Sequence, residues 1–379
     1  MKLLINTSNL YVGGGMQVAL SFINELKEIK TDNEYHIFLS SAIQKQINQE
    51  TFSEQFYFYN IQKSPAPLKN RKEIINMLNK LEEKIQPDIV FSVFGPTFWR
   101  PQSLHIMGFA LPWLINPDSA AFGELKFLQR IKKRLEILYK AYFVKHNADY
   151  YITETEDTKL RFHKYHNIKK EKIYVVGNTY NSYFDNPILD NINLMQKEKN
   201  EFRLITISHN YPHKNLKIIR EVIPYLKKQD IKYKFVLTIS KEEYKKLFLG
   251  FEEYVTTLEA LPVHLCPSAY AQTDALFLPT LLECFTASYP EAMKMEKPIL
   301  TSNLSFAKDI CKDSALYFDP LNPKDIAAKI IALSKNQEVQ QKLVQKGKER
   351  LKTFETARTR AENYLNICDN IIKDGKAKQ

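Results

Sequence analysis

The chain has 379 residues, of which 44% are hydrophobic and 26% charged, an ordinary composition for a soluble globular protein. A chain of this length exceeds what one hydrophobic core usually serves, so two domains are expected. No uncharged apolar run approaches the ~18 residues of a membrane-spanning helix. The four widely spaced cysteines show no CxxC motif, which argues against a disulfide framework or a zinc site. Because the opening MKLLINTSN is too short an apolar run for a signal peptide, the sequence predicts a reduced, cytoplasmic protein.

The first half of the chain alternates predicted strands and helices, which favours a parallel sheet covered by helices. Strands are expected at 3–5, 35–39, 88–93, 103–108, 150–153 and 173–176, and helices at 13–29 and 74–85. Three glycines, Gly13 to Gly15, stand where the first strand meets the first helix. Such glycines permit a tight turn or a close approach of the backbone to a ligand, and both interpretations stay open. Val18 occupies the position where a dinucleotide fingerprint needs its third glycine.

Residues 125–145, LKFLQRIKKRLEILYKAYFVK, place apolar and basic residues at helical spacing. The apolar stripe is formed by Phe127, Ile131, Leu135, Leu138 and Tyr142, and the basic flank by Arg130, Lys133, Arg134 and Lys145. This stripe either faces the core or lies on anionic lipid. The formal charge of +11 calls for an anionic partner, and the sequence contains no nucleic-acid-binding module. We therefore expect an anionic membrane surface rather than nucleic acid, with a peripheral location on the inner face of the plasma membrane.

Residues 185–200 are polar, rich in asparagine and interrupted by Pro187, and they are predicted to link two domains. A second alternating series follows, with strands at 202–207, 233–239, 275–278, 299–301 and 315–318 and helices at 216–228, 241–251, 323–334, 338–351 and 355–372. The predicted domains are 1–184 and 201–352, with a C-terminal segment, 353–379, that packs back on the first domain. Two doubly wound Rossmann-like sheets facing a cleft would bind ligands beyond the carboxyl ends of their strands.

Residues 276–300, LFLPTLLECFTASYPEAMKMEKPIL, are interpreted as a buried strand, a loop, a short helix and a second strand. Glu283 falls in the loop and Glu291 in the first helical turn, with seven residues between them. Unpaired N–H groups at a helix start attract anions, and ionised carboxylates accept hydrogen bonds from sugar hydroxyls. The segment thus predicts a pocket for a phosphorylated sugar. The alternative is that Ser288 and Glu291 form a capping box, so that Glu291 only closes the helix.

Residues 208–215, SHNYPHKN, follow the first strand of the second series and open a predicted helix. The helix dipole slightly disfavours a lysine at such a position, so Lys214 is interpreted as an anion-binding residue rather than a structural one.

Residues 275–303 resemble the E-x7-E segment of retaining glycosyltransferases of family 4, and Lys214 and Asn215 match the lysine–asparagine pair of that family. The resemblance is specific from about residue 205 to 320 and weaker before. It implies the GT-B architecture, with two Rossmann-like domains of which the second binds the donor. It also implies metal-independent, retaining hexosyl transfer from a nucleotide diphosphate sugar, which serves as co-substrate without a further cofactor. The lysine-rich style resembles bacterial enzymes of surface polysaccharide synthesis, whose acceptor is a glycan or a lipid-linked glycan.

The resemblance also implies roles for individual residues. Lys214 would stabilise the departing diphosphate and Glu283 would hold hydroxyls of the donor sugar, which makes these two the catalytic residues, while Glu291 would hold the ribose. The other residues implied on the donor side are Asn215, His209, Asn210, Phe285, Thr286 and Ala287. The residues implied on the cleft and acceptor side are Gly14, Gly15, Gly108, Phe109 and Trp113.

The chain departs from the family pattern at two places. The arginine that the family places several residues before the lysine is absent, and His209 or Asn210 would donate hydrogen bonds without its permanent charge. Gly108 and Phe109 stand where the family carries a histidine motif, and His105 is expected to be a buried strand histidine facing the other way. Two alternatives therefore stay open: a non-catalytic nucleotide-sugar-binding subunit, and a GT-B sugar-nucleotide epimerase, for which no acid/base set is evident.

Overall fold

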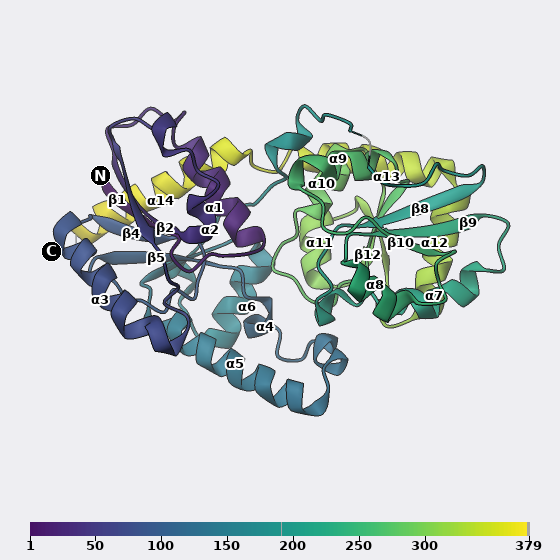
Figure 1. The fold of residues 1–379 in the computed structure, drawn as a ribbon, viewed down its shortest axis with the longest axis horizontal. Coiled ribbons are helices and arrows are strands. Elements are labelled where there is room, and N and C mark those ends of the chain that lie inside the picture. The colour runs from purple at the N-terminus through teal and green to yellow at the C-terminus, as the bar shows by residue number, and fades with distance from the viewer. Residues whose placement is uncertain (191, 377–379) are drawn as a thin grey trace. The chain divides into compact units, whose positions relative to one another are not determined.

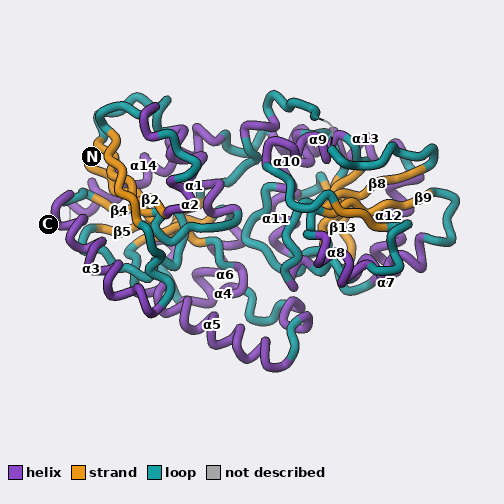
Figure 2. Tube along the Cα trace, in the orientation of Figure 1, coloured by secondary structure: helices purple, strands orange, loops and turns teal. Residues whose placement is uncertain are grey.

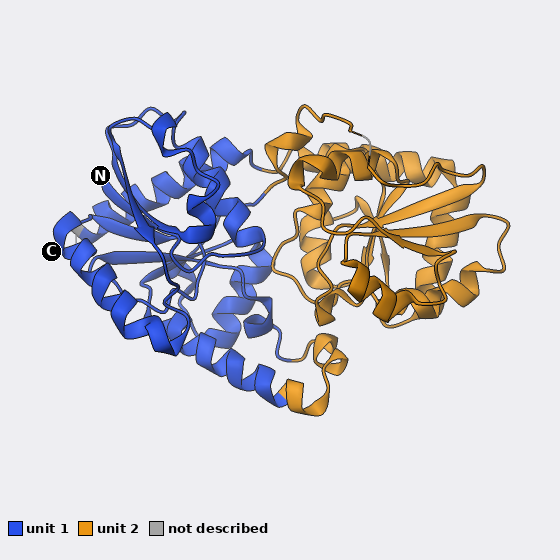
Figure 3. Cartoon of the chain, viewed as in Figure 1, with its two compact units in different colours: residues 1–117, 131–178, 355–379 blue, residues 118–130, 179–354 orange. Residues whose placement is uncertain are grey.

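The structure, a computed structural model, describes residues 1–190 and 192–376 and divides the chain into two compact units (Figure 3). The first unit comprises Met1–Pro117, Ile131–Asn178 and Glu355–Gln379, and the second comprises Asp118–Arg130 and Thr179–Phe354. Asn191 of the predicted linker and residues 377–379 of the predicted C-terminal segment lie outside the described residues.

The first unit is built on a parallel sheet with the strand order β3-β2-β1-β4-β5-β6-β7. Successive side chains of β1 (Lys2–Asn6) point to opposite faces, so Leu3 and Leu4 belong to two different hydrophobic clusters. Helices α1 (Gly14–Glu25) and α14 (Ala357–Lys376) cover one face, and α3 (Leu68–Ile85) covers the other. The remaining elements are β2 (Glu34–Ser40), α2 (Ser41–Gln44), β3 (Phe56–Ile61), β4 (Ile89–Ser92), β5 (Leu104–Phe109), α4 (Pro112–Ile115), α5 (Phe127–His146), β6 (Tyr150–Thr153), α6 (Glu156–His166) and β7 (Ile173–Val175) (Figure 1).

The second unit is built on a parallel sheet with the order β10-β9-β8-β11-β12-β13. Helices α7 (Ile218–Leu226) and α12 (Pro323–Lys335) pack on one face, while α9 (Cys266–Ala271), α10 (Ser288–Lys294) and α11 (Ser305–Cys311) pack on the other. In Figure 2 the strands of this sheet lie between these helices. The remaining elements are β8 (Glu201–Thr206), β9 (Lys232–Leu237), α8 (Lys241–Phe248), β10 (Val255–Thr257), β11 (Ala275–Leu278), β12 (Ile299–Ser302), β13 (Ala315–Phe318) and α13 (Gln337–Leu351).

The predicted class, α/β with two doubly wound parallel sheets, is confirmed. Strands β3 and β10 and helices α2, α4, α6, α9 and α11 were not predicted. Helix α6 buries only Thr158 and Phe162, so its apolar pattern is too sparse to indicate a helix. A local signal was nevertheless present, since the Thr155 hydroxyl accepts a hydrogen bond from the Thr158 N–H at 3.1 Å and acidic residues follow in the first turn.

The predicted domain boundaries need correction at two places. The chain passes from the first unit to the second between Asn178 and Thr179, and residues 185–200 do not form a free linker. Three contacts hold this segment on the second unit: Asp185 pairs with Lys294 at 2.7 Å, the Asp190 N–H donates to the Ser268 hydroxyl at 3.0 Å, and Lys197 pairs with Asp274 at 2.5 Å. Its polar composition suggested a linker, but its polar groups have partners on the surface of the unit.

The second correction concerns residues 118–130, which the sequence assigned to the first domain and which belong to the second unit. The C-terminal helix α14 belongs to the first unit, where it contacts α1 and contributes Tyr364 and Cys368 to the core.

Candidate functional site

The most informative place in the second unit is the carboxyl edge of its sheet. Strand β8 lies between β9, the next strand of the chain, and β11 on its other side. The strand order therefore reverses between β8 and β11, and in open α/β sheets the loops at such a switch point diverge and bind ligands. The loop after β8 contains the 3₁₀ turn η5 (Pro212–Lys214), and the loop after β11 contains Glu283.

These two loops are joined by a shielded ion pair. The Lys214 ammonium contacts Glu283 Oε1, and the two side chains are 16% and 9% exposed. The Thr280 hydroxyl lies 3.0 Å from Glu283 Oε1 and 3.2 Å from the His213 carbonyl, and the Leu281 N–H donates to that carbonyl at 2.7 Å. The predicted catalytic residues Lys214 and Glu283 are thus brought together at the switch point. Thr280, which the sequence did not single out, orients the carboxylate.

Asn215, the residue after Lys214, has a structural partner of its own. Asn215 adopts φ 55°, a left-handed conformation that asparagine tolerates well, and it ends η5. Its buried side chain donates from Nδ2 to the Pro320 carbonyl at 2.9 Å. Asn215 was predicted to bind the donor, whereas the structure gives its Nδ2 a hydrogen bond to the Pro320 carbonyl. The dipole argument for Lys214 also fails, because Lys214 ends a 3₁₀ turn and helix α7 begins only at Ile218.

Glu291 does not take part in capping helix α10. Helix α10 begins at Ser288 with Ala287 at its N-cap, and no side chain caps it, so the capping box does not form. Glu291 Oε2 instead accepts a hydrogen bond from the buried Tyr270 hydroxyl at 3.2 Å. Burial raises the pKa of Glu291 to about 7, and the hydrogen bond from Tyr270 offsets this only in part. A buried carboxyl group that costs free energy to ionise and does not cap its helix is a candidate for ligand binding.

Between these two glutamates, the loop presents backbone donors. Phe285, Thr286 and Ala287 are partly exposed, and within the described residues no acceptor is recorded for their N–H groups. The Ala287 carbonyl accepts a hydrogen bond from the Glu291 N–H at 2.9 Å, so helix α10 begins directly after these three residues. Free amides beside a lysine suit a phosphate group.

His209 and Asn210 lie just beyond β8. His209 is exposed, Asn210 is partly exposed, and the His209 ring lies 5.6 Å from the Tyr211 ring. Both side chains can therefore reach a ligand at this edge. Neither carries the permanent charge of the missing arginine.

The segment 118–130 adds residues that sequence reasoning missed. The Ser119 hydroxyl donates to the Leu281 carbonyl at 3.2 Å, and Glu124 pairs with Lys217 at 2.7 Å. This segment therefore packs against both loops of the switch point. No motif of the sequence indicated this, because the contacts join residues more than ninety positions apart.

In the first unit, the glycines lie at the end of β1. Gly13 adopts φ +79° as the N-cap of α1, so the turn itself requires glycine there. A Cβ at Gly14 would meet nothing within 4 Å, whereas a Cβ at Gly15 would come within 3.1 Å of Phe94. Gly14 lies exposed beside the turn, where a ligand could approach.

Gly108 and Phe109 are not on a surface. A Cβ at Gly108 would lie 1.8 Å from the Val93 carbonyl oxygen, so the neighbouring backbone excludes any side chain there. Phe109 is 1% exposed, and its ring stacks on Phe162 at 4.1 Å. The prediction that these two residues line a cleft is wrong, because close packing of β5 on its neighbours buries both.

His105 is a buried strand histidine, as predicted. Its Nε2 lies 2.8 Å from the Ser92 hydroxyl, its Nδ1 contacts the Asn147 carbonyl, and burial lowers its pKa to about 4. Trp113, on α4, is partly exposed and has the Lys133 ammonium 5.4 Å from its ring. Of the two aromatic residues implied on the acceptor side, Phe109 and Trp113, only Trp113 therefore keeps an accessible ring.

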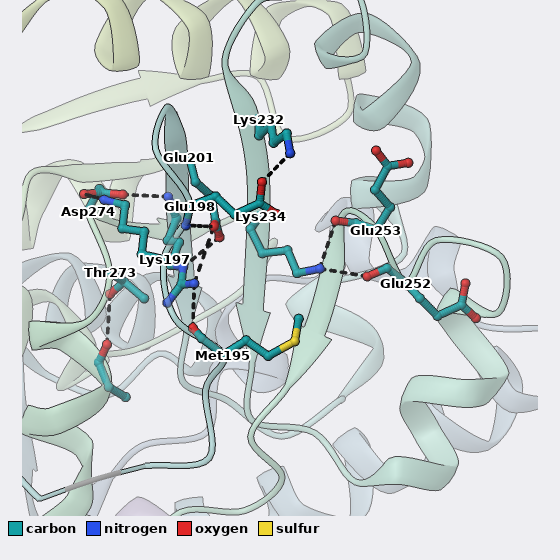
Figure 4. Close-up of polar contacts among 12 residues, drawn as sticks. Met195, Lys197, Glu198, Glu201, Lys232, Lys234, Glu252, Glu253, Thr273 and Asp274 are labelled. Carbon is teal, nitrogen blue, oxygen red and sulfur yellow. Dashed lines mark hydrogen bonds and ion pairs between the residues drawn. The ribbon is translucent and has the colours of Figure 1, made fainter.

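The opposite, amino edge of the same sheet holds a cavity of about 250 Å³, lined by many charged residues. Its charges are matched by neighbours (Figure 4). Lys234 donates to the carbonyls of Glu252 and Glu253 at 2.8 and 2.9 Å, and Lys232 pairs with Glu198. We assign this cluster to stability.

The described ranges, 1–190 and 192–376, contain neither a cluster of metal-ligating side chains nor a membrane-spanning helix. Within them no three His, Cys, Asp or Glu side chains converge as metal ligands. No helix there combines the length and the apolar character needed to cross a bilayer.

The two sheets and the switch-point site define a protein of the GT-B fold. A glycosyltransferase from Rickettsia africae ESF-5 superposes with a TM-score of 0.70 at 14% identity and covers 98% of each chain. HepE from Anabaena in complex with UDP and glucose superposes with a TM-score of 0.68 at 14% identity, over 98% of this chain and all of that one. Residues 190–350 match the model of the family described as Glycosyl transferases group 1. This part of the chain is therefore similar to the group 1 glycosyltransferases.

A curated relative is also a glycosyltransferase. The O-antigen chain mannosyltransferase RfbU of Salmonella typhimurium is 23% identical over 204 residues, which are 52% of this chain and 53% of RfbU. The chain thus spans about half the length of the mannosyltransferase in the alignment.

Proposed function

We propose that the protein is a retaining, metal-independent glycosyltransferase of family 4 that moves a hexose from a nucleotide diphosphate sugar to a glycan or lipid-linked acceptor. The observation that carries the proposal is the Lys214–Glu283 pair at the switch point of the segment similar to the group 1 glycosyltransferases, with Glu291 after seven intervening residues. The similarity to an O-antigen chain mannosyltransferase supports an acceptor of bacterial surface polysaccharide synthesis.

The site supplies what transfer from such a donor requires. The departing diphosphate carries negative charge, and the Lys214 ammonium with the free amides of Phe285, Thr286 and Ala287 would stabilise it. Without a donor, Lys214 contacts Glu283, which neutralises both groups in a shielded place. A bound diphosphate would take over Lys214, and the Glu283 carboxylate would then accept hydrogen bonds from the donor sugar. Lys214 would thereby take the part that a metal ion plays elsewhere.

Glu291 would hold the ribose. An ionised carboxylate accepts two hydrogen bonds from a vicinal diol, and Tyr270 fixes one of its oxygens. Binding of ribose hydroxyls would favour the ionised form that burial disfavours in the free protein.

The first experiment is a thermal-shift screen against UDP, GDP, ADP and CMP. A nucleotide at ~100 times its Kd stabilises the fold by about 2.7 kcal/mol, so the matching one should stand out. Lys214→Ala and Glu291→Ala should lose the shift, and Lys232→Ala, an exposed lysine at the amino edge, should keep it. If no nucleotide shifts the wild type, the donor site is wrong.

A non-catalytic nucleotide-sugar-binding subunit is the second candidate, because Gly108 leaves no space for the histidine of the family pattern. Turnover separates the two. Nucleoside diphosphate released from the donor in the presence of bacterial lipid extract indicates a transferase, and the NMR coupling constant of the product's anomeric proton reports retention. Binding without donor consumption would favour the subunit.

A further inference from the structure

Helix α5 turns its apolar stripe away from the protein. Val144, 1% exposed, is the one buried residue of this helix, all of which is described. Leu128 is 77% exposed and Leu138 68%. The exposed apolar side chains are Phe127, Leu128, Ile131, Leu135, Leu138, Tyr139 and Tyr142. At 100° per residue they fall within about one third of the helix circumference. The interpretation that this stripe faces the core is therefore wrong.

The opposite face of α5 is attached to the first unit. The Phe143 ring lies 5.0 Å from Phe98, and the Arg71 guanidinium lies 4.7 Å from Phe98 and 5.1 Å from Phe143. The Tyr151 hydroxyl donates to the Val144 carbonyl at 2.8 Å. These contacts fix which way the helix faces. The apolar stripe is thus exposed because the opposite face of α5 packs on the first unit.

Helix α5 also carries far more positive than negative charge. The helix carries six lysine and arginine residues and a single acidic one, Glu136. Glu136 pairs with Lys133 and Lys140, each at 2.6 Å, on the side away from the stripe. Lys132 and Lys145 are exposed at the two margins of the stripe. An apolar face bordered by positive charge matches the acyl–headgroup boundary of an anionic bilayer.

We propose that α5 docks the protein on an anionic lipid surface, with the helix axis in the plane of the interface and the apolar stripe among the acyl chains. A second copy fits this face less well, because two strongly basic helices would be placed against each other. A monomer in water rarely leaves so long an apolar stripe uncovered. The proposal stands on α5 alone and does not depend on glycosyl transfer.

The test is co-sedimentation of the full chain with vesicles of phosphatidylethanolamine and phosphatidylglycerol, compared with vesicles of phosphatidylcholine. The wild type should partition onto the anionic vesicles at least tenfold more strongly. The double variant Leu135→Asp/Leu138→Asp should lose at least tenfold in partition coefficient. Its matched control is Leu249→Asp/Leu321→Asp, two exposed leucines of the second unit at 77% and 56%, which should bind as the wild type does. Circular dichroism and the midpoint of thermal unfolding report folding of each variant.

A second pair of variants tests the charge. Lys132→Gln/Lys145→Gln should weaken binding severalfold and flatten its dependence on salt, whereas the exposed pair Lys245→Gln/Lys342→Gln should not. Equal binding to neutral and anionic vesicles, or full binding by the leucine double variant, would overturn the proposal. So would a wild-type dimer that leaves vesicles unbound and that Leu135→Asp/Leu138→Asp converts to monomer, because the stripe would then be an interface between copies.

Discussion

The two edges of the sheet in the second unit are both rich in charge, yet they differ in how that charge is matched. At the amino edge, Arg203 is buried against Glu201 and donates to the Met195 carbonyl, and its neighbours are paired in the same way. At the carboxyl edge, Lys214 contacts one carboxylate beside amides that have no recorded acceptor among the described residues, and Glu291 has a pKa raised to about 7. A cluster of charges therefore does not mark a site. Charged and polar groups that are only partly compensated, at a topological switch point, are the better indicator of a site.

The largest difference between the edges should appear in turnover. We expect Lys214→Ala to lower donor turnover by about 10²–10³-fold, because the charge that stabilises the departing diphosphate is lost. Lys232→Ala at the amino edge is the matched control and should retain wild-type turnover. The measurement is release of nucleoside diphosphate at saturating donor. A Lys214→Ala enzyme within tenfold of wild type would show that this edge is not the reactive one.

The next largest effect should fall on stability and at the other edge. Arg203→Met leaves the Glu201 carboxylate shielded and unpaired, since the two side chains are 4% and 8% exposed. Breaking such a pair costs about 3 kcal/mol of unfolding free energy, or roughly 6–12 °C in the unfolding midpoint of a unit this size.

The double variant Glu201→Gln/Arg203→Met is the control for that prediction. It should recover part of the loss, because no charge is then left unpaired. Nucleotide affinity at low temperature should match wild type in both variants. A changed affinity would mean that the two edges are coupled.

The substitution Glu291→Gln should have opposite effects on the stability of the free protein and on nucleotide binding. Its folded pKa, about 7, lies above the ordinary 4.5, so ionisation costs stability as pH rises from 4.5 to 7. Glu291→Gln removes that cost and should stabilise the free protein at pH 8 by up to about 3 kcal/mol, with no gain near pH 4.5. The same variant should bind nucleotide roughly tenfold more weakly at pH 8, where the wild-type carboxylate is ionised.

Two measurements check this: unfolding by urea at pH 4.5 and pH 8, and nucleotide titration across the same range. Wild-type affinity should rise with pH through about 7, whereas the affinity of Glu291→Gln should stay flat. A variant that is destabilised at pH 8 would indicate a structural role for the carboxylate.

The smallest effect is expected for an exposed pair of the amino edge. Lys197→Ala removes the ion pair with Asp274, in which the two side chains are 41% and 25% exposed. Such surface pairs contribute well under about 1 kcal/mol, so unfolding by urea should change little. A loss comparable to that of Arg203→Met would mean that the whole edge acts as one network.

The sequence alone determined the α/β class, the two parallel sheets and the residue types of the candidate site. Alternation of apolar strands with amphipathic helices is a local signal, and Lys214, Glu283 and Glu291 lie in short segments whose pattern resembles one family. Short or sparsely apolar elements such as α6 and β10 were not predicted, because their stability comes from the unit on which they pack.

Tertiary structure alone decided how those residues are used. It assigned Asn215 to Pro320, freed Glu291 from its helix cap, buried Phe109 and joined the segment 118–130 to the switch-point loops. It also turned the stripe of α5 outward, although the sequence is equally compatible with a stripe that faces the core. Periodicity shows that a helix has an apolar face. Which face is buried depends on contacts between residues far apart in the chain, and no local pattern contains them.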